Sequence, residues 1–297
     1  MSRRDKVDRI GRSLIQHGPL SDRVHLMRLD PADCPRIIGQ MRVLAATKGY
    51  SKIFAKVPAS LVSHFHGAGY ADEAVVPRLF PAPGGGREPG HFLGLYLAPW
   101  RSHEPRQALV EDVLQASRTA ARTSARNPEP GAPLGEVRRL DPDAAGEMAA
   151  LYNRVFATYP TPLHDPQYIR QAMAGHTAWF GLRRDGALAA LGSCDMDQAL
   201  GQVEMTDLAV APRARGAGLA IRILARMEQA MARAGLRKAY AIVRGTSYAA
   251  NISFARLGFA HAGTLPRNTN ISGALESMHV WHKPLDRNAG TGAPAAS

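Results

Sequence analysis

The feature that most constrains this chain is the stretch from Gln202 to Ala234, where an apolar strand breaks at Pro212 into a glycine-rich turn and continues as a helix. Two glycines, Gly216 and Gly218, let the backbone turn sharply and approach a ligand closely. The first N–H groups of the following helix have no intrahelical partner and lie at the positive end of its dipole. Turn and helix together predict an anion site that suits a phosphate.

The helix is predicted by apolar residues at near-helical spacing, which are Leu219, Ile223, Met227 and Met231. Gly235 is a suitable helix end. Taken alone, the turn is equally consistent with a plain connection, because a motif needs its structural context. Ile221 stands where a dinucleotide fingerprint needs a third glycine, and the Lys-Ser/Thr ending of a P-loop is missing, so both of those sites are disfavoured.

The pattern Arg213-x-x-Gly216-x-Gly218, between a strand that carries Glu204 and a long amphipathic helix, resembles the acetyl-CoA signature of the Gcn5-related N-acetyltransferases. The resemblance implies acetyl-CoA as co-substrate and no metal. Ser247 and Asn251 are weaker candidates for contacts to pantetheine, because either can serve simply as a helix-start residue. The implied cofactor-binding residues are Leu208, Ala209, Val210, Arg213, Arg215, Gly216, Ala217, Gly218, Leu219 and Ala220.

The composition limits the number of domains and the class of protein. With 297 residues, 45% of them hydrophobic, the chain can bury a sizeable core and is long enough for two domains. It contains no apolar run of membrane-spanning length and no signal-peptide pattern, so we expect a cytoplasmic protein. Cys34 and Cys194 are far apart and predict neither a disulfide framework nor a zinc site.

The formal net charge of +12 comes mostly from arginines spread along the whole chain, without a dense basic run. We therefore expect attraction of anionic cofactors rather than binding of nucleic acid or a membrane. The expected partner is a small-molecule amine. The oligomeric state is left open, a homodimer included.

Residues 127–135 are rich in proline and glycine and cannot hold a helix or a central strand, so they are expected to link two domains. We expect an N-terminal α/β half-domain over residues 1–126, an acetyl-CoA-dependent N-acetyltransferase domain over residues 136–285, and a disordered tail over residues 286–297. Residues 1–18 are polar and basic, and there we expect partial order with one amphipathic turn.

The two parts share a similar order of expected elements. Residues 46–79 parallel residues 232–265 as helix end, strand, short helix, Gly-aromatic and strand, although the first part lacks the glycine turn. We therefore expect a degenerate half-domain of similar fold that extends the sheet or shapes the acceptor pocket and binds no CoA of its own. A chance likeness of two α/β segments is the alternative.

The expected element order of the second domain, β-α-α-β-β-β-α-β-α-β-β, resembles the acetyltransferase fold. The fold class is α/β (α+β), with a mixed, mostly antiparallel sheet flanked by helices. Asp141 and Asp165 are the expected N-caps of its first two helices, and its last two strands are expected over residues 259–265 and 277–283.

Four further segments are more specific than the glycine turn, namely Tyr50–Pro58, Tyr159–Pro166, Glu204–Asp207 and Asn268–Trp281. Together they resemble the bacterial and archaeal beta-lysine epsilon-N-acetyltransferases, over about residues 10–285. The resemblance implies acetylation of the ε-amine of β-lysine, giving the compatible solute N-ε-acetyl-β-lysine in osmotic adaptation. The alternatives are another small amine, amino acid or protein amine as acceptor, or a non-catalytic acyl-CoA-binding regulatory module.

The chemistry requires a base, because an alkyl ammonium has a pKa near 10.4 and must lose a proton before it attacks a thioester. The resemblance puts a glutamate base at Glu204, whose alternative is a solvated strand carboxylate. Strand alternation places Asp207 on the opposite face unless a bulge intervenes, and the family has such a bulge. Phe254 stands where the family has a tyrosine acid, so Tyr248 or a water is the expected substitute.

The acceptor pocket needs groups for one carboxylate and two amines. The resemblance implies Tyr159, His164, Asp207, Asn268, Asn270 and Glu276 as its lining. The alternative for Asn268 and Asn270 is a turn, and for His164 a surface loop. Arg244 and Arg267 are candidates for the acceptor carboxylate, although surface arginines are the commoner case.

Overall fold

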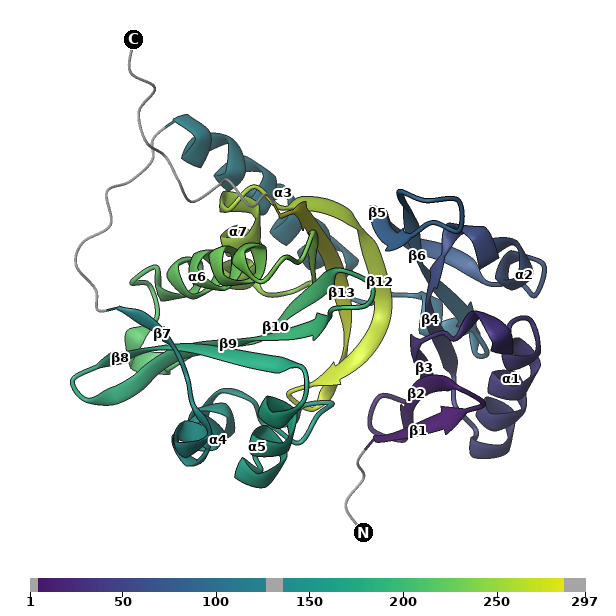
Figure 1. Cartoon of the computed structure of the whole chain (residues 1–297), viewed down its shortest axis with the longest axis horizontal. Helices are drawn as coiled ribbons and strands as arrows, with labels where there is room; N and C mark the ends of the chain where they lie inside the picture. Colours follow the sequence, from purple (N-terminus) through teal and green to yellow (C-terminus); the bar gives the residue numbers. More distant parts are fainter. Residues whose placement is uncertain (1–4, 127–135, 286–297) are drawn as a thin grey trace.

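A computed structural model of the chain describes residues 5–126 and 136–285. The predicted linker (127–135) and tail (286–297) lie outside the described residues. The described strands form one sheet in the order β1-β2-β3-β4-β6-β5-β12-β13-β11-β10-β9-β8-β7. In Figure 1 the N-terminal part, in purple and blue, and the C-terminal part, in green and yellow, meet along the curved yellow strand β12. None of the described helices is both long and apolar enough to cross a membrane.

The N-terminal part begins with a hairpin, β1 (Lys6–Ile10) and β2 (Ser13–Gly18), where residues 1–18 predicted only a turn. The prediction was wrong because β2 is buried on nearly its whole length, so its sequence shows no alternation of polar and apolar residues. A distant residue also holds the hairpin turn. The Asp33 carboxylate accepts hydrogen bonds from the backbone N–H groups of Arg12 (2.9 Å) and Ser13 (2.8 Å).

The remaining elements of this part are β3 (Arg23–Arg28), α1 (Arg36–Lys48), β4 (Lys52–Pro58), α2 (Val62–His66), β5 (Ala71–Pro81) and β6 (Arg87–Tyr96). Asp30 caps a short 3-10 turn at Pro31–Asp33, and α1 follows it. The buried residues Ile37, Met41 and Ala45 seat α1 on the sheet in a core of its own. Strands β3 and β4 pair in parallel on either side of this helical crossover, which brings residues 23–26 and 52–55 side by side.

The helix α3 (Gln107–Arg126) ends the described N-terminal part but packs on the other one. Its residues Leu114 and Ala121 contact the core of the C-terminal part, and its Val110 carbonyl accepts a hydrogen bond from the His279 ring (3.2 Å). Figure 1 shows α3 running alongside α7 (Tyr248–Arg256). The packing unit of the C-terminal part therefore includes a helix that precedes the predicted linker.

The C-terminal part contains β7 (Val137–Arg139), α4 (Ala145–Val155), α5 (Pro166–Ala174), β8 (Thr177–Arg184), β9 (Ala187–Asp197), β10 (Gln202–Val210), α6 (Leu219–Arg233), β11 (Lys238–Arg244), α7, β12 (Ala260–Ile271) and β13 (Ala274–Pro284). This is the predicted element order and fold class. Both predicted caps are present, since Asp141 accepts from the N–H of Asp143 (3.1 Å) and Asp165 from that of Gln167 (2.8 Å).

Strand β12 is longer than predicted. Its pairing with β13 shifts register between Leu265 and Thr269, and Arg267 has a positive φ of 39°. This irregularity and the polar run after it hide the strand in the sequence, yet β12 continues to Ile271 because the N-terminal part supports it.

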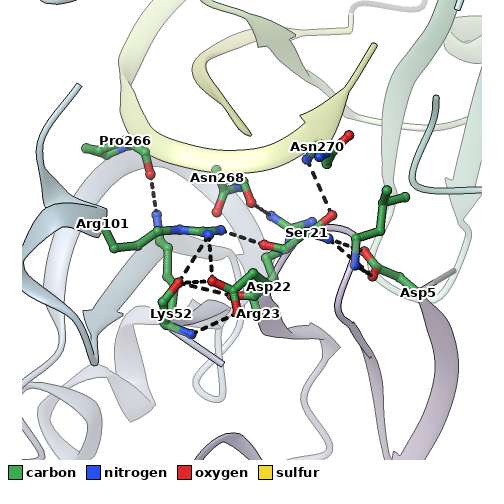
Figure 2. A network of polar contacts seen from close by, with 11 residues as sticks. Asp5, Ser21, Asp22, Arg23, Lys52, Arg101, Pro266, Asn268 and Asn270 are labelled. Carbon is green, nitrogen blue, oxygen red and sulfur yellow. Dashed lines mark hydrogen bonds and ion pairs between the residues drawn. The ribbon is translucent and has the colours of Figure 1, made fainter. Parts of the chain in front are cut away.

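The junction of the two parts is built on β12. Within the described residues, β5 and β12 pair at Ala74 and Gly263, where a Cβ on Gly263 would lie 2.2 Å from the Glu73 carbonyl oxygen. Figure 2 shows three cationic side chains of the N-terminal part beneath β12. Lys52 donates to the Pro266 carbonyl (2.9 Å) and Arg23 to the Asn268 carbonyl (2.7 Å), while Arg101 ties Ser21 and Ser51 together beneath them.

Candidate active site

Strands β10 and β11 part at the centre of the sheet. They pair in parallel only from Gln202 to Glu204 and from Lys238 to Tyr240 within the described residues. Beyond that point β10 continues to pair with β9, and β11 with β13. The facing edges of residues 205–210 and 241–244 thus offer backbone N–H and C=O groups that the sheet does not use, and such groups can bind an amide-containing chain such as pantetheine.

Strand β10 carries a bulge, as expected, on the edge that pairs with β9. Its pairing with β9 shifts register between Thr206 and Ala209, and Asp207 adopts a left-handed backbone with φ of 53°. An extra residue reverses the alternation of side chains along a strand. Glu204 and Asp207 consequently line the same cavity.

The glycine turn is open to solvent. Gly216 (φ 81°) and Gly218 (φ 69°, the N-cap of α6) both adopt left-handed backbone, and a Cβ on either would meet no atom within 4 Å. Arg213 and Arg215 beside them are exposed. The first turn of α6 therefore presents its N–H groups, flanked by two cations, to free space, an arrangement that fits the pyrophosphate of CoA.

A cavity of about 160 Å³ lies between the two parts of the molecule, next to the point where β10 and β11 diverge. This volume is below the roughly 300 to 1,000 Å³ of sites for drug-sized ligands, so the cavity suits a small solute. Its wall from the C-terminal part includes Tyr159, Tyr168, Trp179, Asp195, Glu204, Thr206, Asp207 and Asn268. Its wall from the N-terminal part includes Gln16, Arg23, His25, Met27 and Phe54.

Glu204 has the electrostatics of a base that works near neutral pH. Burial raises the pKa of its carboxyl to about 7, against the opposing effect of the Lys56 ammonium. The two are linked through one hydroxyl, since Lys56 Nζ donates to the Tyr240 hydroxyl oxygen (2.6 Å) and that hydroxyl donates to Glu204 Oε2 (2.9 Å). A carboxylate held this way can both accept a proton and pass it on.

Two further carboxylates face the cavity. Burial raises the pKa values of Asp195 and Asp207 above their usual range. Ser193 donates to Asp207 Oδ2 (2.5 Å), and Asp195 lies 3.0 Å from the His176 ring at the rim. Three acidic groups in one small cavity attract and hold a cation, since a bound ammonium relieves their mutual repulsion.

The sequence of this chain is similar to those of known acetyltransferases. The family described as "Acetyltransferase (GNAT) family" matches residues 147–259. The chain is 31% identical to beta-lysine N(6)-acetyltransferase of Methanococcus maripaludis over 279 residues, which are 94% of this chain and 98% of that protein.

The chain belongs to the GNAT acetyltransferase family. It is 26% identical to beta-lysine N(6)-acetyltransferase of Methanosarcina mazei over 84% of this chain and 97% of that protein. It is also 28% identical to the N-acetyltransferase YodP of Bacillus subtilis, over 72% of this chain and 79% of that protein. Among solved structures, the ribosomal-protein-S18-alanine N-acetyltransferase from Escherichia coli matches 55% of this chain and 99% of that one, at 16% identity and a TM-score of 0.45. GNAT enzymes take their acetyl group from acetyl-CoA.

Four residues that the sequence singled out meet in the cavity of this GNAT acetyltransferase, namely Tyr159, Glu204, Asp207 and Asn268. Three others expected in the pocket are engaged elsewhere. The His164 ring lies 3.0 Å from the Phe156 carbonyl, and Asn270 Oδ1 accepts from Thr158 (2.9 Å). Glu276 is buried against Arg106 (2.9 Å). All three hold loops and helices in place around the acceptor side.

The residues proposed for the departing thiolate and for pantetheine have other contacts as well. Tyr248 is 40% exposed and its hydroxyl donates to Asp112 on α3, outside the cavity lining. Asn251 is fully buried, where its amide donates to the carbonyls of Arg244 (3.0 Å) and Ser247 (2.8 Å) and accepts from Trp281 (2.8 Å). Phe254 is buried in the core of this part, and its phenyl ring has no ionisable group.

The arginines considered for the acceptor carboxylate do not line the cavity. The Arg267 guanidinium stacks 4.7 Å above the centre of the Trp100 ring, on the outer side of the junction, and Arg244 is likewise absent from the lining. Four residues near this cavity were not predicted from the sequence, namely Arg23, Lys56, Asp195 and Tyr240. Lys56 lies in one of the segments that carry the resemblance, but nothing near Arg23 in the sequence indicates an active site.

A histidine and aspartate cluster lies outside the lining of this cavity. His66, Asp72 and His91 offer ligand atoms within 4.8 Å of one another on the N-terminal part. The Asp72 carboxylate already contacts both rings, at 2.7 Å from His91 and 3.1 Å from His66. These contacts account for the cluster without an ion.

Proposed function

We propose that this chain transfers the acetyl group of acetyl-CoA to the ε-amine of β-lysine, with Glu204 as the base. The observation that carries the proposal is a carboxyl with a pKa of about 7 inside a small acidic cavity, beside the opening between β10 and β11. The relatives named as beta-lysine N(6)-acetyltransferases support the choice of acceptor.

Acetyl-CoA supplies an activated acyl carbon. The glycine turn and the N-terminus of α6 would hold its phosphates, and the unpaired edges of β10 and β11 would hold its pantetheine. The acceptor enters as an ammonium, attracted by the carboxylates. Glu204 removes its proton, directly or through a water, and the neutral amine attacks the thioester carbonyl, forming the C–N bond as the C–S bond breaks.

Tyr240 and Lys56 prepare Glu204 to take the proton. The Lys56 ammonium donates to the Tyr240 hydroxyl and that hydroxyl donates to Glu204, so both bonds favour the carboxylate form, and we assign release of the proton to solvent. Phe254 occupies the position at which the family pattern has the tyrosine that protonates the leaving thiolate. We assign protonation of the CoA thiolate to solvent, which is consistent with a thiol pKa far below that of an amine.

The cavity also bears on the kind of acceptor. The N-terminal part walls it on one side, leaving about 160 Å³, which disfavours a folded protein as substrate and favours a free small amine. Acetylation converts β-lysine from a molecule with one net positive charge into one with none. Such a neutral, highly soluble product is what a compatible solute requires, so we include osmotic adaptation in the proposal.

The test is release of CoA from acetyl-CoA by purified protein, with β-lysine, α-lysine, ornithine and spermidine as acceptors. We expect the highest kcat/KM with β-lysine and acetylation at its ε-nitrogen, as read by mass fragmentation. The control is Glu111→Gln, a carboxylate-to-amide change on exposed α3, which should leave turnover unchanged. Turnover confined to spermidine, or none with any of these amines, would contradict the proposal.

A further inference from the structure

The acceptor cavity has a cationic side, and it comes from the N-terminal part. Arg23 lies on β3, is only 4% exposed, and forms part of the cavity wall. One of its nitrogens is fully used, since Nη1 donates to the Asn268 carbonyl (2.7 Å) and to Thr269 Oγ1 (3.1 Å). Its Nε and Nη2 have no hydrogen-bond partner among residues 5–126 and 136–285, and no carboxylate there forms an ion pair with it.

A buried guanidinium without a counter-ion is costly, so its retention needs a reason. The contact between the two parts accounts for the hydrogen bonds of Arg23 Nη1, but not for Nε and Nη2 of the same guanidinium. A second unpaired group stands beside it. Asn268, which is 1% exposed and also lines the cavity, has a side-chain oxygen with no partner among the described residues. Two buried polar groups that lack hydrogen-bond partners in the lining of one cavity indicate that a polar ligand completes them.

The same cavity is also lined by the carboxyl groups of Asp195, Glu204 and Asp207. Its lining thus combines three acidic groups with one guanidinium, that of Arg23. A guanidinium fork matches a carboxylate in geometry and charge, whereas a polyamine would place an ammonium against it.

We propose that Arg23 binds the carboxylate of the acceptor, so that the N-terminal part selects amino acids that carry a distal primary amine. The inference rests on the proposed acetyl transfer and adds the residue that reads the far end of the acceptor. It also gives the N-terminal part a function in binding, since this part supplies the guanidinium in addition to extending the sheet.

Figure 2 supplies the matched control. Arg101 belongs to the same buried network beneath β12, where it donates to the Ser21 carbonyl (2.6 Å) and to Ser51 (3.2 Å), but it does not line the cavity. Arg101→Gln therefore perturbs the junction without touching the acceptor, while Arg23→Gln perturbs both. Arg23→Lys keeps the charge and loses the second prong of the fork.

The experiment measures kcat/KM for β-lysine and for its carboxamide, and binding of both to the CoA-loaded protein by calorimetry. Loss of a charge-assisted pair lowers affinity roughly 10- to 100-fold. We expect the wild type to prefer β-lysine over the carboxamide by about that factor, and Arg23→Gln to abolish the preference by losing activity on β-lysine alone. Arg23→Lys should be intermediate, and Arg101→Gln should keep the preference.

The other outcomes distinguish failure of the role of Arg23 from failure of the proposed acetyl transfer. A wild type without preference, or an Arg23→Gln protein that keeps it, overturns the role of Arg23 and leaves acetyl transfer standing. Arg23-dependent binding of β-lysine without turnover supports the role of Arg23 and overturns the proposed function. If the wild type neither binds nor acetylates β-lysine, both are overturned. The comparison of the two acceptors on wild-type protein needs no variant, so it stands even where Arg23→Gln does not fold.

Discussion

Replacing Glu204 by glutamine tests the assigned base through two independent measurements. The first is turnover. A general base contributes about 10² to 10⁴ in rate, so we expect kcat for Glu204→Gln to fall by roughly that factor, with little change in affinity for acetyl-CoA. Wild-type activity should rise with pH through about 7 as Glu204 loses its proton, and this ionisation should be missing from the variant.

The second measurement is stability. The pKa of Glu204 rises from 4.5 to about 7 on folding. Below pH 4.5 both the folded and unfolded states hold the proton, and the shift has no effect. Between 4.5 and 7 only the unfolded state releases it, so wild-type stability falls as pH rises, and above 7 the loss is complete. Glutamine never ionises and escapes this loss.

The size of the loss follows from the shift. A change of about 2.5 pKa units corresponds to roughly 3.4 kcal/mol, which we reduce to about 1 to 2 kcal/mol because the carboxyl faces an open cavity. For a chain of this size that is roughly 2 to 6 °C in the unfolding temperature. Without ligands, Glu204→Gln should therefore unfold at a higher temperature than the wild type at pH 8, and the gap should narrow at pH 5. A gap that is absent at pH 8, or equal at both pH values, would refute the buried-carboxylate reasoning.

Three further changes test other parts of the molecule. Lys56→Met removes the cation that lowers the pKa of Glu204, so the ionisation in the pH profile of activity should move upward by about 1 unit; a downward shift would contradict the linkage through Tyr240. Gly218→Ala places a Cβ on a left-handed residue at a strain of about 1 to 2 kcal/mol, and KM for acetyl-CoA should rise roughly 5- to 30-fold while KM for the acceptor stays constant. Met227→Ala empties a fully buried position under α6 and should lower the free energy of unfolding by about 2 to 5 kcal/mol in urea titrations, with both KM values retained.

The part of the chain proposed to bind acetyl-CoA could be predicted from the sequence because its signals are local. The strand, glycine turn and helix over residues 202–234 lie consecutively in the chain, and the apolar spacing of α6 by itself specifies the face that is buried. The helix caps Asp141 and Asp165 and the turn glycines Gly216 and Gly218 likewise depend on a few neighbouring residues. Glu204, the proposed base, lies in the same stretch.

The acceptor side depends on contacts between distant residues. Arg23 meets the carbonyl of Asn268, which lies 245 positions away, and no local pattern indicates that pair. The same holds for β2, whose strand character comes from burial by neighbours, and for β12, which looks like a turn after Leu265. His164, Asn270 and Glu276 were assigned to the pocket from their resemblance alone, and their contacts in the structure are to backbone, threonine and arginine groups outside it.

Gly263 defines a boundary at which the molecule can be recombined. Because a side chain there would collide with the backbone of Glu73, the two parts meet at a position that tolerates only glycine. Around this position they share a buried apolar cluster, in which Phe54 and Phe92 of the N-terminal part join Tyr240 of the C-terminal part. The glycine turn and the opening between β10 and β11 both lie in the C-terminal part. A chimera that keeps residues 107–285, α3 included, and takes residues 1–106 from a relative with a different acceptor should therefore keep the proposed acetyl-CoA site, and exchange of parts becomes a route to new acceptors.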